Sequence, residues 1–298
     1  MKALNGLLGL ILLSSCAGRA IQAPREGASA DNGAMQRSTL LVRRLAWLEG
    51  GLQTDYESDR RVAGEALGKW EGKVPGPDDV DGRLDYLSTL SASGRHAEAA
   101  SGLQGLLGTR PDEKRAVFLL AANALRAKRH ELAKFLLGRL EKDAGFPWKS
   151  LVYNNLGMLA LQEGNRQGAL GYLEKAAKAE PRNAAPLVNL GALYLQSRAF
   201  GDAEALFSEA VQLDSGFEDA ALGLGASLEG VGKFEDAHRV YSEHMAGNPE
   251  ALSVAFNDSI LLGNRLQRRE DAAQQMLRYI QRGGKESARA HEIIQSWR

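Results

Sequence analysis

The sequence is short of cysteine, of aromatic residues and of any excess of charge. Its single cysteine, Cys16, rules out a disulfide within the chain, and aromatic residues make up 6% of the 298 residues. Its 37 basic and 37 acidic side chains give a formal net charge of zero. This balance argues against a protein that binds nucleic acid or an acidic membrane through charge.

Catalytic motifs are missing as well. The chain has no GxGxxG following a strand, no Walker loop, no HExxH and no GxSxG. Of its five histidines, His96 and His130 fall at the same point of successive sequence units, which indicates surface or packing positions rather than metal ligands. We therefore expect no catalytic site, no metal and no cofactor other than a covalent lipid.

What the sequence does contain is a repeat. Residues 150–217 hold two similar stretches, in which Asn155-Leu156-Gly157 recurs 34 residues later as Asn189-Leu190-Gly191. A fixed period between 20 and 50 residues indicates a stacked repeat array. The spacing predicts a pair of helices in each unit, with small residues where the two backbones approach closely.

The 34-residue frame extends over most of the chain. The central alanine of each second helix recurs at Ala99, Ala133, Ala169, Ala203 and Ala237. The turn position is Gly94, Lys128, Gly164, Arg198 and Gly232. Units are expected at about 80–113, 114–149, 150–183, 184–217 and 218–251, and residues 252–283 form a degraded sixth unit with Ala272 one residue late. Tyr172 or Leu173, and Phe207, should fill the space between adjacent hairpins.

This pattern resembles the tetratricopeptide repeat family, most clearly in the units from residue 150 to 251. The resemblance implies an all-α, right-handed superhelical solenoid of about five to six helical hairpins. Such arrays need atypical capping helices at both ends, since a terminal hairpin lacks a neighbour. Residues 34–73 are expected to form the N-terminal helical cap, and 287–298 the C-terminal one. A leucine spacing in 35–72 also admits a coiled-coil dimer, although sustained heptads are absent.

The N-terminus reads as a targeting segment. Lys2, the apolar run Leu7–Leu13 and the small residues after it are typical of a signal peptide, and the run is too short to span a bilayer. Leu13-Ser14-Ser15-Cys16 resembles a bacterial lipobox, which implies that Cys16 becomes a lipidated N-terminus. Ala17 following it implies sorting to the outer membrane, with the folded part in the periplasm.

The expected organisation follows from these features. It comprises a signal peptide (1–15), a lipidated cysteine with a flexible tether (16–33), an N-terminal helical region (34–73), a repeat array (80–286) and a C-terminal capping helix (287–298). The tether is rich in Gly, Ala, Ser and charged residues and has no apolar period.

In the tetratricopeptide family, ligands contact the first helix of each unit along a concave groove. Carried over by register, the resemblance implies a mostly apolar partner-binding groove with amides, unlike the basic clamps that hold acidic peptide tails. Packing between hairpins is an equally good explanation for any single member. The residues placed in this groove are Phe118, Leu151, Asn154, Asn155, Met158, Val188, Asn189, Ala192, Leu195 and Leu222.

Taken together, these features predict a non-catalytic, lipid-anchored scaffold that binds another envelope protein. The plan resembles repeat lipoproteins that serve pilus, secretion or gliding-motility machines, which implies partners such as a secretin, another outer-membrane β-barrel or a motility component. Two alternatives stay open. One is an adaptor that docks peptidoglycan enzymes, and the other is a soluble regulatory subunit.

Overall fold

The structure is a computed structural model that describes residues 64, 67–68, 70 and 74–297. These residues form thirteen α-helices, α4 to α16, and within them there is no β-strand, which confirms the all-α prediction. The signal peptide, Cys16, the tether and most of the 34–73 region lie outside the described residues.

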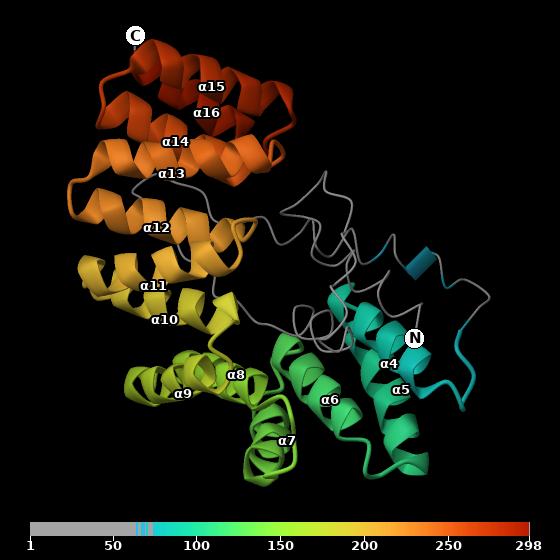
Figure 1. The fold of residues 1–298 in the computed structure, drawn as a ribbon. Helices are drawn as coiled ribbons and strands as arrows, with labels where there is room; N and C mark the ends of the chain where they lie inside the picture. Colours follow the sequence, from blue (N-terminus) through green and yellow to red (C-terminus); the bar gives the residue numbers. More distant parts are fainter. Residues whose placement is uncertain (1–63, 65–66, 69, 71–73, 298) are drawn as a thin grey trace. The chain divides into compact units, whose positions relative to one another are not determined.

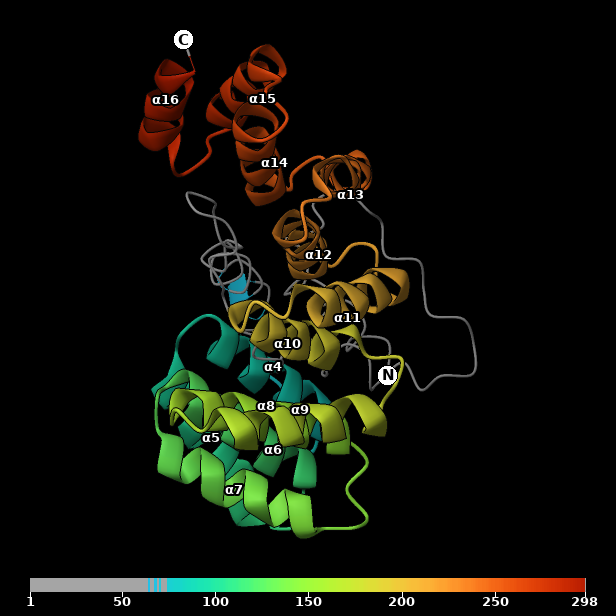
Figure 2. The same cartoon turned by 90° about the vertical axis from the view of Figure 1, so that its left-hand side faces the viewer.

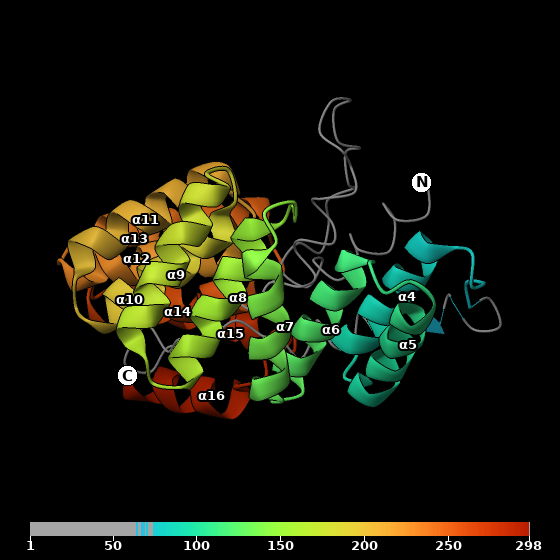
Figure 3. The same ribbon diagram turned by 90° about the horizontal axis from the view of Figure 1, so that it is seen from below.

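The helices fall into two compact units, divided between Pro181 and Arg182. The first unit contains three hairpins, each a pair of antiparallel helices of 13 or 14 residues. They are α4 (Val80–Ala92) with α5 (His96–Thr109), α6 (Lys114–Arg126) with α7 (His130–Lys142), and α8 (Lys149–Gln162) with α9 (Arg166–Ala179). Figures 1 and 3 show α4 and α5 lying side by side.

The second unit contains three more hairpins and a final helix. They are α10 (Ala184–Gln196) with α11 (Phe200–Leu213), α12 (Glu218–Gly230) with α13 (Phe234–Gly247), α14 (Leu252–Asn264) with α15 (Arg269–Gln281), and α16 (Ser287–Ser296). In Figure 1 the helices α10 to α14 follow one another in chain order within this unit, and α15 and α16 lie at its end. The six hairpins match the predicted sequence units.

The turns inside the hairpins follow the predicted register. All five expected positions have a positive φ: 90° at Gly94, 59° at Lys128, 77° at Gly164, 61° at Arg198 and 80° at Gly232. The residue after each turn position donates its backbone N–H to the carbonyl five residues back, as Asn165 does to Ala160 at 2.8 Å. This is the Schellman arrangement that ends a helix with a left-handed residue.

The sixth hairpin departs from this pattern by one residue. Its left-handed residue is Gln267, with φ 57°, and Arg268 donates its N–H to the carbonyl of Leu262, six residues back. The extra residue therefore lies in the turn, which explains why Ala272 comes one position late in the sequence frame.

Small residues occur where two helices meet. The central alanine of each second helix has no exposed surface; these residues are Ala99, Ala133, Ala169, Ala203, Ala237 and Ala272. A Cβ added to Gly157 would lie 2.9 Å from Cγ of Leu173, and one added to Gly191 would lie 3.0 Å from Cε2 of Phe207. The glycines thus let the first helix approach the second closely, as the sequence predicts.

Large side chains fill the space between hairpins. Phe207 is fully buried, and a Cβ on either Gly191 of its own hairpin or Gly223 of the next would overlap or crowd its ring. Leu173 takes the corresponding place on α9, whereas Tyr172 is only half-buried. Of the two residues that the sequence left open, Leu173 is therefore the filling one.

Both ends of the array carry additional contacts. Leu67 belongs to the hydrophobic core of the first unit, and the ring of Trp70 lies 5.9 Å from that of Tyr86 on α4. At the other end α16 runs beside α15 (Figure 2). Ile294 and Trp297 of this segment are buried, while His291 and Glu292 are exposed. The apolar face of α16 covers the end of the array and its polar face is exposed to solvent, as predicted for a capping helix.

Candidate functional site

The sixth position of the repeat is polar in four of the six first helices. It is occupied by Asp85 on α4, Asn155 on α8, Asn189 on α10 and Asn257 on α14. All four side chains are at most 1% exposed. Buried polar groups need interaction partners, and Asp85, Asn189 and Asn257 each have one within the protein.

Asn155 has an amide donor without a partner. Its Oδ1 lies 3.5 Å from Nδ2 of the neighbouring Asn154, but no acceptor among the described residues lies within hydrogen-bonding distance of its own Nδ2. The side chain is fully buried. An unpaired buried donor destabilises the fold by about 1–3 kcal/mol.

The structure buries all ten residues that the family register places in the groove. Their exposed fractions are 8% or less, the largest being that of Leu195. Leu151, Val188 and Leu222 are each exposed by 1% or less, as a packing residue would be. Which of the ten a ligand touches stays a prediction.

Phe118 lies in an aromatic cluster. Its ring centroid is 6.0 Å from that of Phe146 and 5.8 Å from that of Trp148, and the last two are 5.6 Å apart. Phe146 and Trp148 flank Pro147, in the short insertion that separates α7 from α8. The insertion therefore supplies core packing around Phe118 in the first unit.

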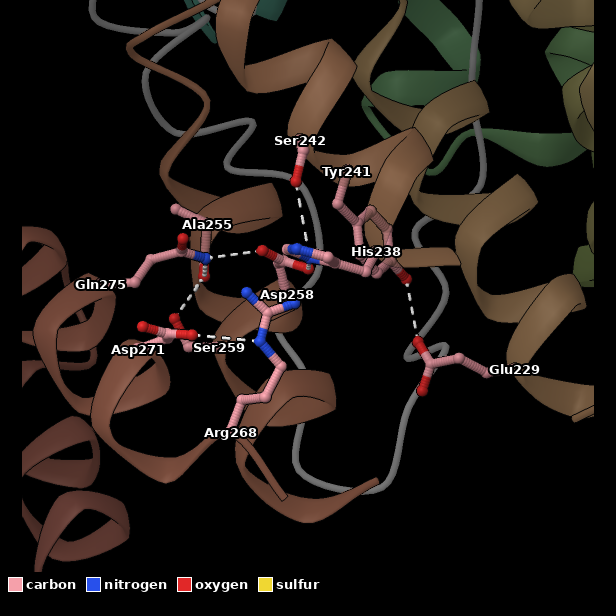
Figure 4. A network of polar contacts seen from close by, with 10 residues as sticks. All are labelled: Glu229, His238, Tyr241, Ser242, Ala255, Asp258, Ser259, Arg268, Asp271 and Gln275. Atoms are coloured by element: carbon pink, nitrogen blue, oxygen red, sulfur yellow. Dashed lines mark hydrogen bonds and ion pairs between the residues drawn. The ribbon is translucent and has the colours of Figure 1, made fainter. Parts of the chain in front are cut away.

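The second unit holds a buried polar network (Figure 4). Asp258 on α14 has no exposed surface, and its Oδ1 lies 2.7 Å from Nδ1 of His238 on α13. Nε2 of Gln275 on α15 donates to Oδ2 of Asp258 at 2.9 Å and to the carbonyl of Ala255 at 3.0 Å. Burial raises the pKa of Asp258 above its ordinary value of 3.8, although the hydrogen bonds from His238 and Gln275 act in the opposite direction.

A second, partly buried carboxyl lies on the neighbouring helix α12. Glu229 accepts a hydrogen bond from the hydroxyl of Tyr241 at 3.2 Å. Burial raises the pKa of Glu229 to about 7, with a further upward contribution from Asp258 and opposing ones from Tyr241 and Arg265. Tyr241 is fully buried, and the pKa of its hydroxyl is raised well above 10 by burial and by the neighbouring carboxylate.

Ser242, His238 and Asp258 do not form a hydrolytic triad. Both the serine hydroxyl, at 3.4 Å, and the aspartate, at 2.7 Å, contact the same ring nitrogen, Nδ1 of His238. A triad requires them on opposite ring nitrogens, because the histidine must accept from one while donating to the other. Within the described residues, no three His, Cys, Asp or Glu side chains are grouped as metal ligands would be.

The repeat register contained a signal for part of this network. Asp258 stands 34 residues after Leu224, which itself follows Leu156 and Leu190 at the same spacing. A charged residue at a repeat position otherwise occupied by leucine is unusual, and the sequence reasoning missed this signal. Its partners His238 and Gln275 come from two other helices, and no feature of the sequence pattern singles them out.

Residues 154–216 match the family model of the tetratricopeptide repeat. The match covers most of two hairpins, α8 to α11, and agrees with the period, the turns and the small residues described above. The fold is that of a tetratricopeptide-repeat protein. No curated protein matches the sequence.

Solved structures with the tetratricopeptide fold are similar to this chain. A chain of the APC/C hetero-tetramer Cut9–Hcn1 is 15% identical with a TM-score of 0.60, and the match covers 81% of this chain and 47% of that one. Yeast Tom70 is 9% identical with a TM-score of 0.59, covering 98% of this chain and 69% of that one. A thermophilic TPR protein of Thermus thermophilus is 20% identical with a TM-score of 0.50, covering 60% and 97%. At these identities the likeness concerns the fold alone, and the chain spans about half the length of the Cut9–Hcn1 chain.

Proposed function

We propose that this protein is a non-catalytic scaffold that binds another protein along the first helices of its tetratricopeptide hairpins. The observation that carries the proposal is the buried amide of Asn155, whose Nδ2 has no acceptor among the described residues. The same register position holds Asn189 and Asn257. The unpaired amide of Asn155 suits a backbone carbonyl of a partner segment laid along the array.

The proposal places this scaffold at the outer membrane, facing the periplasm. Its support is in the sequence: the chain's only cysteine follows Leu13-Ser14-Ser15, after an apolar run with Lys2 before it. Acyl chains on Cys16 would hold the protein at the bilayer, because each buried CH₂ contributes roughly 0.8 kcal/mol. No helix in the described part of the chain is both long and apolar enough to cross a membrane.

The partner in this proposal is an envelope protein of a surface motility, pilus or secretion machine, such as a secretin or another outer-membrane β-barrel. The support for this partner is the domain organisation, in which a tetratricopeptide array follows a lipidation motif in the sequence. Fold similarity does not choose among machines, so the partner must be identified directly.

Site-specific crosslinking tests the binding surface. A photoreactive side chain at Gln162 or Gln196, exposed at the ends of the first helices α8 and α10, should capture the partner in cells. Lys178 and Gln212, exposed near the ends of the second helices α9 and α11, are the matched controls. Capture only from the two control positions would contradict the proposed surface.

The identity of the captured protein distinguishes the proposed roles. A secretin, a pilus component or a motility β-barrel supports the machine scaffold. Recovery of cell-wall synthases or hydrolases would assign the protein to the alternative class of peptidoglycan-enzyme adaptors. Capture of a cytosolic enzyme would favour a soluble regulatory subunit.

A single substitution tests the role of the amide. Asn155→Leu removes the unpaired donor at similar volume, so it should leave stability unchanged or raise it. If the amide serves the partner, the same variant should bind it at least tenfold more weakly, since a hydrogen bond of about 1.4 kcal/mol is lost. Unchanged affinity with a folded variant would exclude Asn155 from recognition.

The anchor is tested separately. Cys16→Ala should move the protein from the membrane fraction to the soluble fraction and abolish labelling with a radioactive fatty acid. Cys16→Ala that still sediments with outer membranes would contradict lipidation as the anchor.

A further inference from the structure

The junction between the fifth and sixth hairpins is polar where the corresponding column of the array is apolar. Asp258 stands at the repeat position held by Leu156, Leu190 and Leu224, and it is fully buried. The usual cost of burying a carboxylate is several kcal/mol unless it is hydrogen-bonded or protonated. A substitution of this kind changes how the last hairpin is attached.

Three helices meet at this carboxyl group. His238 comes from α13 and Gln275 from α15, at 2.7 and 2.9 Å from the two oxygens of Asp258 on α14 (Figure 4). The link from α13 to α14 therefore depends on a hydrogen bond whose strength changes with protonation.

Glu229 adds a second titratable group on the other side of the same junction. It replaces the leucines found at this position in the two preceding hairpins, Leu161 and Leu195, and it accepts from the hydroxyl of Tyr241. Tyr241 in turn stands where Phe207 stands one hairpin earlier. An apolar pair in the fourth hairpin thus becomes a hydroxyl and a carboxyl in the fifth.

The helices beyond the junction have a hydrophobic core of their own. Phe256, Ile260, Met276, Tyr279, Ile294 and Trp297 belong to one cluster, and all of its buried members come from the segment that contains α14 to α16. Nε1 of Trp297 donates to Oδ1 of Asn264 at 2.8 Å and closes this segment at its end. A segment that has an internal core and a junction containing buried polar groups can open as a unit.

Several ionisable groups lie on the elements around the two carboxyls. Those of α12 and α13, besides Glu229, His238 and Tyr241, are Glu218, Asp219, Glu235, Asp236, Arg239, Glu243 and His244. Arg265 and Arg268, from the turn after α14, act on Glu229 and Asp258 respectively, and Arg268 is also paired with Asp271 at 3.0 Å. On α11, Glu204 is paired with Lys233, while Asp202 and Glu209 are exposed. The only ionisable side chain of α10 is that of Tyr194.

We propose that α14–α16 form a module whose attachment to α12–α13 is controlled by protonation of Glu229 and Asp258. This inference does not depend on the proposed function. Its physical basis is that Asp258 is fully buried and Glu229 partly buried at the junction, and that both carboxyls become more hydrated when the module opens. The attached state holds their protons more tightly than the open state does.

The direction follows from linkage. Burial raises the pKa of both groups in the attached state, to about 7 for Glu229, above the 4.5 of an exposed glutamate. The stabilisation from protonated Glu229 is therefore fully present below pH 4.5 and is lost as the pH rises through about 7. The module should be closed most firmly in acid and open more often at alkaline pH.

Hydrogen exchange measured by mass spectrometry tests this on the full-length protein. After correction for intrinsic exchange rates, protection of α14–α16 relative to α10–α11 should fall about tenfold between about pH 6 and pH 8, because Glu229 ionises over that range. Equal relative protection at both pH values would overturn the proposal.

Two variants make the test specific. Glu229→Gln should remove most of the pH dependence, and adding Asp258→Asn should remove the rest. Glu270→Gln, at an exposed position of α15, is the matched control and should leave the dependence intact. If Asp258→Asn does not fold, Glu229→Gln alone decides. A pH dependence that survives in Glu229→Gln, or that disappears in Glu270→Gln, would overturn the assignment.

Discussion

The ring of Tyr241 lies directly against the backbone of Gly225. A Cβ added to Gly225 would overlap the ring, and Tyr241 has no exposed surface into which it could move. Gly225 is the third member of the series begun by Gly157 and Gly191. The series therefore sets the distance between the two helices of a hairpin.

Gly225→Ala should lower the free energy of unfolding by about 2 kcal/mol, because the added methyl group overpacks the α12–α13 contact. Urea denaturation followed by circular dichroism would measure the change. The control is Gly201→Ala on α11, where nothing lies within 4 Å of the new Cβ. That variant should be neutral or slightly more stable, and an equal loss in both would contradict the close-contact explanation.

The turn glycines can be separated from the packing glycines. Gly164 has φ 77° and open space around its Cβ position, so Gly164→Ala should cost about 1 kcal/mol through backbone strain alone. Gly171 is equally open but lies within the α9 helix. Gly171→Ala should therefore raise stability by about 0.5–1 kcal/mol. Thermal unfolding should therefore show a lower melting temperature for Gly164→Ala and a higher one for Gly171→Ala.

Arg198 occupies a left-handed turn position with φ 61° although it is not a glycine. Arg198→Gly should raise the stability of the protein by roughly 1 kcal/mol, since the strain of the left-handed conformation is removed. A glycine introduced at the exposed helical position Gln274 on α15 should lower it by about 1 kcal/mol. A loss of stability in Arg198→Gly would show that the side chain makes a stronger contribution than the backbone strain.

His244 gives a pH dependence opposite in sign to that of Glu229. Burial lowers the pKa of His244 below 6.5, and Nδ1 donates to the carbonyl of Ser215 at 3.2 Å. The unfolded chain therefore binds the proton more tightly, and the stability that His244 contributes above pH 6.5 is lost as the pH falls below it.

The variant His244→Asn keeps a donor near Ser215 but cannot be protonated. It should lose less stability than the unmodified protein between about pH 7 and pH 5, as measured by chemical denaturation at each pH. His291→Asn, at an exposed position of α16, is the control and should follow the unmodified protein. An identical pH profile for His244→Asn would contradict the assignment.

Trp297 closes the last hairpin. Its ring packs against Gly263 and its indole nitrogen donates to Asn264. Trp297→Ala should lower stability by about 3 kcal/mol, because a large buried ring is removed. Hydrogen exchange would measure the effect, and the loss of protection should be confined to α14–α16. Ser296→Ala, at an exposed neighbouring position, is the control. Uniform loss over the first unit as well would contradict a local role.

Much of the fold could be predicted because it is encoded locally. The turn at Gly164 and the alanine at Ala169 follow from the 34-residue period, because each unit repeats the same residue types at the same positions. Even the shift at Gln267 had a sequence trace, since Ala272 comes one residue late. The sequence reasoning left Leu173 and Tyr172 open, although the repeat register favours Leu173, which stands 34 residues before Phe207.

The binding site could be predicted less well than the fold. The register carried over from the family selects residues such as Val188 and Ala192, and the structure shows that they are buried. Position along a repeat determines the face of the helix, but the exposed fraction depends on what packs over that face. The aromatic cluster around Phe118 is an example, because Phe146 and Trp148 come from an insertion outside the repeat.

By itself, the sequence determined the helix spans, the left-handed turns, the close-contact glycines and the apolar cap of this protein, because each depends on residues within one repeat unit. Only the tertiary structure decided which buried polar groups meet. The contacts between His238, Asp258 and Gln275, and between Glu229 and Tyr241, join different helices. The His238–Asp258 distance is set by the stacking of the fifth hairpin on the sixth, whereas the other two contacts join the two helices of one hairpin. Burial in the folded protein raises the pKa values of the two carboxyls.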